Sequence, residues 1–145
     1  MPFKFNVSDK KGKTYHFESE SEEIIGKQLK DVISGNIILS DLHDYELEIT
    51  WASDKAGLPS LEKVEGIGLK RLLLTYGKGM HKRPIGNKKK IKRRPKGLRL
   101  RKTIRGKVIS QDISQINLKI LKEGKKKLSE IFSEQGKEKV KENRE

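Results

Sequence analysis

The sequence predicts a mainly β protein of the α+β class: a small antiparallel β-barrel with one short helix in the N-terminal half, a long basic loop and a C-terminal helix. Three observations lead to this prediction. Short segments in which apolar and polar residues alternate outnumber segments with helical spacing. One long segment contains no acidic residue and is interrupted by proline and glycine. The C-terminal residues carry a few apolar side chains at helical spacing in a polar background.

The N-terminal residues predict a β-hairpin. Residues 3–8 (FKFNVS) and 13–18 (KTYHFE) both alternate between apolar and polar side chains, which is the pattern of a half-buried strand. The segment between them, DKKG, ends in Gly12. Glycine can adopt the positive φ that a tight turn requires, so the two strands are expected to pair.

A short helix is predicted to follow the hairpin. Ser19 and Glu22 have the spacing of a capping box, in which the two residues satisfy the first backbone N–H groups of a helix. Apolar residues then recur at the spacing of one helical face: Ile25, Leu29, Val32 and Ile33. Gly26 weakens this helix, and Gly35 marks its expected end.

Four further strands and a terminal helix complete the predicted fold. Residues 45–51 alternate between apolar and polar side chains, and residues 69–75 (LKRLLLT) predict a buried strand. Residues 104–110 and 115–121 predict a closing pair of strands. Residues 126–143 predict a polar helix with a small apolar face.

The predicted division is one barrel domain over residues 1–122 and a polar helical tail over residues 123–145. Within the domain, residues 76–103 are expected to form a basic loop, because Pro84, Gly86, Pro95 and Gly97 interrupt any helix or strand period there. A loop longer than about 15 residues is uncommon in a compact domain unless it has a function or is disordered. We therefore expect this loop to bind a ligand.

The positive charge of the chain is concentrated in one segment. Residues 1–65 hold 8 basic and 13 acidic side chains, whereas residues 66–111 hold 17 basic and no acidic side chains. Residues 112–145 hold 9 basic and 7 acidic side chains, which brings the net charge of the 145 residues to +14. A segment without carboxylates repels itself and favours an external polyanion.

Several classes of function find no support in the sequence. The chain has no cysteine, which excludes disulfides, thiolate metal sites and a cysteine nucleophile. Its three histidines lack ligand spacing, and no nucleophile and base occur in a catalytic pattern, so we expect no metal, no cofactor, no small-molecule substrate and no enzymatic activity. No apolar run is long enough for a membrane span or a signal peptide, so the expected location is the cytoplasm.

Nucleic acid is the partner that best fits the basic segment, since lysine and arginine neutralise phosphates and release counterions. A membrane surface fits less well, because no amphipathic apolar face accompanies the charge. Between Gly77 and Lys107 there is no aromatic residue on which an unstacked base could lie. The sequence therefore predicts recognition of the backbone and shape of structured RNA. A chromatin or transcription protein and an RNA-modifying enzyme on a small barrel are the alternatives.

Several separate blocks of the sequence resemble a known family. They are Ser53-Asp54-Lys55-x-Gly57-x-Pro59, Lys70-Arg71-Leu72-Leu73-Leu74 followed by Gly77, Arg101-Lys102-Thr103-Ile104-Arg105-Gly106, and Ile116-Asn117-Leu118-x-Ile120 followed by Gly124. In this order they are similar to the archaeal and eukaryotic small-subunit ribosomal protein S6e family, in its short archaeal form. The resemblance implies a β-barrel-like domain, a place in the small ribosomal subunit, and ribosomal RNA and neighbouring ribosomal proteins as partners. The chain departs from the family pattern at Trp51 and Ala52, where small residues or glycine are usual, and at Leu58 and Ser60.

The predicted RNA-binding residues come from both lines of reasoning. The resemblance implies Lys55, Arg71, Arg101, Lys102 and Arg105. The basic segment adds Lys78, His81, Lys82, Arg83, Lys88, Lys89, Lys90, Lys92, Arg93, Arg94, Lys96, Arg99 and Lys107. Four glycines are predicted where the backbone needs freedom or a close approach, namely Gly57, Gly77, Gly79 and Gly106.

Overall fold

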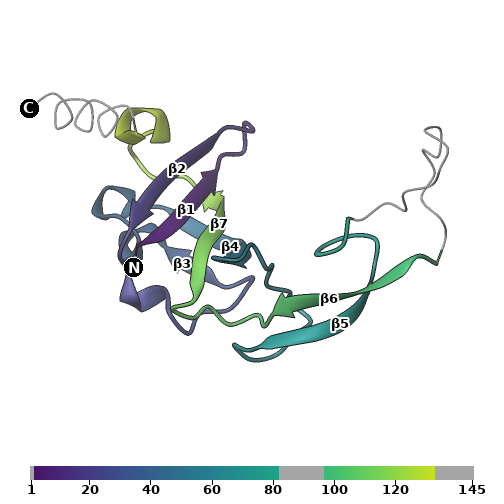
Figure 1. The fold of residues 1–145 in the computed structure, drawn as a ribbon. Helices are drawn as coiled ribbons and strands as arrows, with labels where there is room; N and C mark the ends of the chain where they lie inside the picture. The colour runs from purple at the N-terminus through teal and green to yellow at the C-terminus, as the bar shows by residue number, and fades with distance from the viewer. Residues whose placement is uncertain (1, 82–96, 133–145) are drawn as a thin grey trace, which may run out of the picture.

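The structure is a computed structural model that describes residues 2–81 and 97–132. A five-stranded sheet is joined to a two-stranded ribbon that extends away from it (Figure 1). The sheet contains β1 (Phe3–Ser8), β2 (Thr14–Ser19), β3 (Val32–Ser34), β4 (Glu46–Asp54) and β7 (Ile113–Lys122). The ribbon consists of β5 (Leu69–Thr75) and β6 (Arg99–Arg105). Short 3-10 turns are η1 (Glu22–Ile24), η2 (Gly35–Ile37) and η3 (Ser40–Leu42).

The strand order of the larger sheet is β2-β1-β7-β4-β3. All of its neighbours pair antiparallel except β1 and β7, which run parallel. The strands β2 and β3 form the two edges, so the sheet is open and the predicted closed barrel is not shown. The mainly β class of the prediction is confirmed. No helix among the described residues has the length and apolar content needed to cross a membrane.

The hydrophobic core covers one face of this sheet. Alternate side chains of the central strands point into it, and Phe5, Leu47 and Leu118 are fully buried. Ile24 and Leu42, from the segment between β2 and β4, close the core. Burying a side chain of this size contributes roughly 1.5–3 kcal/mol, so this cluster holds the sheet that carries the ribbon.

The predicted hairpin is confirmed, and so are the strands predicted over residues 45–51 and 115–121. In the hairpin, β1 pairs with β2 from Phe3 opposite Ser19 to Ser8 opposite Thr14. Gly12 in the connecting turn has φ 84°, as the turn requires. The two later strands are longer than predicted, because β4 continues to Asp54 and β7 spans Ile113–Lys122.

The predicted helix around residues 25–33 is wrong. Only the 3-10 turn η1 forms, and residues 32–34 form the edge strand β3. The backbone leaves the helical region at Gly26 (φ 89°) and Lys30 (φ 79°). The N–H of Gly26 donates to the carbonyl of Ile109, and that of Leu29 donates to the carbonyl of Lys107. These long-range hydrogen bonds replace the local ones of a helix, so tertiary pairing overrides the helical spacing.

The ribbon corrects three predictions. Residues 99–103 form most of β6 and do not belong to the basic loop, which is therefore shorter than residues 76–103. The strand predicted over residues 104–110 is displaced, since β6 ends at Arg105 and pairs with β5, not with β7. The strand β5 has the predicted bounds but is not buried, because Leu69 and Leu73 are 52% and 55% exposed. A two-stranded ribbon can cover only one of its faces.

The C-terminal helix begins at Leu128 and is described as far as Phe132. Leu128 and Ile131 are buried in the main core, so the start of the helix packs on the sheet. The ring of Phe132 stacks on Tyr15 at 5.0 Å and lies 5.3 Å from Phe17, measured between ring centroids. The rest of the predicted helix, residues 133–143, lies outside the described residues.

Candidate nucleic-acid interface

The outer face of the ribbon is cationic. In an antiparallel pair, residues opposite each other lie on the same face. The cross-strand pairs Arg71 with Thr103, Leu73 with Arg101, and Thr75 with Arg99 therefore share one face. All six side chains are exposed. This face therefore carries three guanidinium groups. The two strands that carry them form an extended ribbon (Figure 1).

The inner face of the ribbon fixes its position. Ile104 is fully buried against Leu61 and Val64, and Leu72 and Leu74 pack on this small cluster. Lys102 lies opposite Leu72 in the register and is half-buried on this inner face. The inner face holds the ribbon on the segment between β4 and β5, which leaves the outer face open to a ligand.

Ion pairs of Arg105, the last residue of β6, hold this end of the ribbon against the larger sheet. Its Nε donates to Asp54 Oδ2 at 2.8 Å, and its Nη1 donates to Asp112 Oδ2 at 3.1 Å. The side chains of Arg105 and Asp54 are only 10% and 12% exposed. The guanidinium group is occupied by these carboxylates, so we leave Arg105 out of the interface despite the sequence-based prediction.

The ion pair between Asp54 and Arg105 makes the stability of the fold dependent on pH. Burial alone would raise the pKa of its carboxyl. The hydrogen bond and charge of Arg105, with the backbone N–H groups of Lys55 and Ala56, outweigh that effect and lower the pKa below 3.8. Because the folded pKa is lower than the unfolded one, the contribution to stability is complete above about pH 4. It is lost as the pH falls through the lowered pKa.

We therefore expect the free energy of unfolding, measured in urea between pH 2 and pH 7, to fall on the acid side of about pH 4. The variant Asp54→Asn should be less stable at pH 7 and should show a weaker acid decline. Asp112→Asn is the matched control, because the Asp112 side chain is 66% exposed. An equal flattening of the pH profile by both variants would contradict the assignment to Asp54.

The other predicted RNA-binding residues within the described part of the chain have carboxylates or an aromatic ring as neighbours. Lys78 Nζ lies 3.1 Å from Glu62, and Lys107 Nζ lies 3.1 Å from Glu65. His81 meets the ring of Tyr76 edge-on at 5.6 Å between centroids. Lys55 lies in the turn after β4 and borders a cleft with acidic neighbours. The remaining predicted contacts, Lys82, Arg83, Lys88, Lys89, Lys90, Lys92, Arg93, Arg94 and Lys96, lie outside the described residues.

The glycines singled out in the sequence have two kinds of environment. Gly57, Gly77 and Gly79 have positive φ values of 77°, 149° and 81°. Gly79 also faces Leu74, so the turn it forms folds back on the inner side of the ribbon. Gly106 is different, because a Cβ there would lie 1.8 Å from the carbonyl oxygen of Gly66. Two backbone segments of the chain are in close contact at this point, immediately after Arg105.

Sequence reasoning missed two features of this region. The exposed Leu69 and Leu73 lie next to the arginines on the outer face, although the sequence predicts a buried strand over residues 69–75. Trp51 and Tyr76 line one cavity at the end of β5, although no aromatic residue occurs in the basic segment after Tyr76. The basic residues 70 and 71 at the start of β5 are a signal that could have indicated exposure of this strand. The second depends on contacts between distant segments.

Comparisons with known proteins give one consistent result. The family model described as "Ribosomal protein S6e" matches residues 3–133. A protein of Archaeoglobus fulgidus named "Small ribosomal subunit protein eS6" is 44% identical over 139 residues, which cover 92% of this chain and 98% of the relative. A Methanococcus maripaludis protein of the same name is 42% identical over 125 residues, covering 86% of this chain and 90% of the relative. The Methanocaldococcus jannaschii protein of that name is 34% identical over 134 residues, covering 92% of each chain.

Proposed function

Because this chain belongs to the ribosomal protein S6e family of the small ribosomal subunit, we propose that it is a structural, non-catalytic component that binds ribosomal RNA through the outer face of its ribbon. The family resemblance in the sequence is thereby confirmed. The proposal extends to the basic residues 82–96, which follow the ribbon in sequence. It places the protein on ribosomes in the cytoplasm, where ribosomal RNA and neighbouring ribosomal proteins are its partners.

The exposed arginines carry this proposal. Arg71, Arg99 and Arg101 share one face, and no carboxylate among the described residues forms an ion pair with them. Unpaired guanidinium groups bind phosphate oxygens with two parallel hydrogen bonds. Along a strand, Arg99 and Arg101 are about 7 Å apart, so separate phosphates can occupy them.

The leucines on the same face indicate how the ribbon meets RNA. Leu69 and Leu73 alternate with the arginines and present aliphatic surface between them. The minor groove of an RNA helix is wide and shallow and displays sugars between phosphates. A ribbon with aliphatic and cationic side chains in alternation fits such a surface by shape, in agreement with the backbone recognition expected from the sequence.

Sedimentation on a sucrose gradient tests the proposed function. We expect the protein in a cell extract to sediment with small ribosomal subunits at moderate salt and to be released as the salt concentration rises, because phosphate contacts depend on released counterions. A protein that stays at the top of the gradient at moderate salt would contradict the proposal. Binding to DNA as tight as binding to RNA would favour the chromatin or transcription alternative.

A further inference from the structure

A cavity of about 300 Å³ lies where the end of β5, away from Arg105, meets β4 and the segment after it. It is formed by β4, the segment that follows it and the end of β5, with the turn after β5 on the remaining side. Its volume is at the small end of the range for ligand pockets, about 300–1,000 Å³. The ligand it can hold is therefore a single small ring system and not a whole nucleotide chain.

The walls of the cavity suit a flat aromatic ligand. Trp51 and Tyr76 contribute aromatic surface, and Leu61 and Leu74 contribute aliphatic surface. Ser60 also lines the cavity, and it is only 2% exposed. Its hydroxyl has no hydrogen-bond partner among the described residues. A buried hydroxyl without a partner is unfavourable, so a ligand that hydrogen-bonds to it is favoured.

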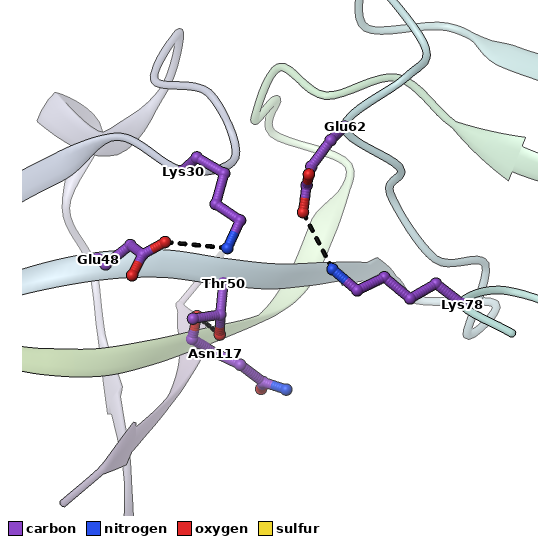
Figure 2. Close-up of polar contacts among 6 residues, drawn as sticks. All are labelled: Lys30, Glu48, Thr50, Glu62, Lys78 and Asn117. Atoms are coloured by element: carbon purple, nitrogen blue, oxygen red, sulfur yellow. Dashed lines mark hydrogen bonds and ion pairs between the residues drawn. The ribbon is translucent and has the colours of Figure 1, made fainter. Parts of the chain in front are cut away.

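Charged groups of both signs lie at the cavity. Glu62 and Lys78 line it and form an ion pair with 3.1 Å between Oε1 and Nζ. Figure 2 shows this pair extending toward β4, and a second pair, Lys30 with Glu48 at 3.0 Å, also reaching that strand. The pKa of Lys30 is raised, first by its hydrogen bond to Glu48 and in smaller part by the charge of Glu62. The two pairs therefore act on each other, and the rim offers both donors and acceptors.

The backbone conformation of Lys30 directs its side chain toward β4, next to the cavity. Lys30 has φ 79°, a left-handed conformation that is unfavourable for a lysine. Its N–H donates to the carbonyl of Ile49 on β4, which holds it in this conformation. The conformation places the Lys30 side chain within reach of Glu48, beside the cavity wall at Thr50 (Figure 2).

Resting on the proposed function, we propose that this cavity binds one unstacked nucleobase of the RNA whose phosphates contact the ribbon. The base lies against the Trp51 ring between aliphatic walls, because aromatic rings stack on the faces of bases. Its edge hydrogen-bonds to Ser60, Glu62 and Lys78. The basic segment needs no aromatic residue of its own, because β4 and Tyr76 supply the rings.

The polar groups favour guanine among the four bases. Guanine presents N–H donors at N1 and N2 beside an acceptor at O6. The Glu62 carboxylate can accept from the two N–H groups while the Lys78 ammonium donates to O6. Adenine, cytosine and uracil do not offer N–H donors at two adjacent positions beside an acceptor. The Glu62 carboxylate thus matches the donors on this edge of guanine, and the Lys78 ammonium matches the acceptor O6.

Trp51 is the only tryptophan of the chain, so its fluorescence reports directly on this cavity. The probe is a short abasic ribose–phosphate oligomer that carries a single guanosine at its centre. We expect this probe to quench the fluorescence of the unmodified full-length protein and to bind about fivefold or more tightly than the fully abasic oligomer of equal charge. The abasic oligomer should bind, as followed by anisotropy, without quenching. Oligomers with one adenosine or uridine should fall between the two.

The outcomes separate this inference from the proposed function. Equal affinity and equal quenching with and without the base would overturn the nucleobase site and leave the ribbon interface standing. Failure of both oligomers to bind would overturn the proposed function as well. Trp51→Leu should abolish the advantage of guanosine, whereas Trp51→Phe, which keeps a ring, should retain it. The measurement on the unmodified protein decides the question even if Trp51→Leu does not fold.

Discussion

Replacement of Arg71, Arg99 and Arg101 together by glutamine is expected to lower the affinity for a transcript of small-subunit ribosomal RNA by roughly 100-fold. Each guanidinium contact with a phosphate contributes at least about 1 kcal/mol. The three free-energy losses add, so the corresponding factors in affinity multiply. The log–log slope of the affinity against salt concentration should become shallower by about 2 to 3, since three fewer phosphates are neutralised. Thermal stability should change little, because all three side chains are exposed.

A matched control is available in the turn between β1 and β2. Lys10, Lys11 and Lys13 are exposed there, at the end of the hairpin that points away from the ribbon (Figure 1). Their joint replacement by glutamine removes the same charge but no ribbon contact. We expect nearly unchanged affinity and salt slope. Equal effects of the two triple variants would show that only net charge matters, which would contradict a defined interface on the ribbon.

Replacement of Arg105 by alanine is expected to lower the free energy of unfolding by about 3 kcal/mol at pH 7. The loss arises mainly because Asp54 is left buried with an unpaired charge, not because the attraction itself is large. Denaturation in urea measures the change. The double variant Asp54→Asn with Arg105→Ala removes both charges and should be more stable than Arg105→Ala alone, as a double-mutant cycle with Asp54→Asn would reveal.

The same Arg105 variant shows whether Arg105 acts through its ion pairs within the fold or through a contact with RNA. Under conditions in which the variant is folded, its salt slope for RNA binding should equal that of the unmodified protein. If stability were unchanged and the slope became shallower by about 1, Arg105 would be a phosphate contact, as the family resemblance implies. The ion pairs with Asp54 and Asp112 lead us to expect the first result.

Local patterns predicted those elements whose signal lies within a few residues. The alternation in residues 3–8 and 13–18 with Gly12 between them specifies a hairpin without reference to the rest of the chain. The alternation of β4 likewise identifies a strand with one buried face. The segment around Leu29 gave a false helical signal, because its backbone is satisfied by Lys107 and Ile109, which are distant in sequence.

The candidate interface was predictable in its chemistry but not in its geometry. An acid-free segment indicates a polyanionic partner, yet the register that places Arg71, Arg99 and Arg101 on one face depends on pairing across a long connection. The separation of Arg105 from the other arginines depends on Asp54, which lies 51 residues earlier in the chain. Sequence alone does not show which cations already have a carboxylate partner.

The ribbon also determines how the free protein behaves before it meets its ligand. A two-stranded sheet consists entirely of edge strands, and exposed edges with apolar side chains such as Leu69 and Leu73 are templates for aggregation between molecules. Positive charge on such strands opposes their side-by-side association, because like charges would be brought together. We therefore expect the arginines of the outer face to oppose self-association of the free protein, and we expect a polyanion that bridges two ribbons to weaken this effect. Solubility and ligand binding thus place the same demand on this strand pair.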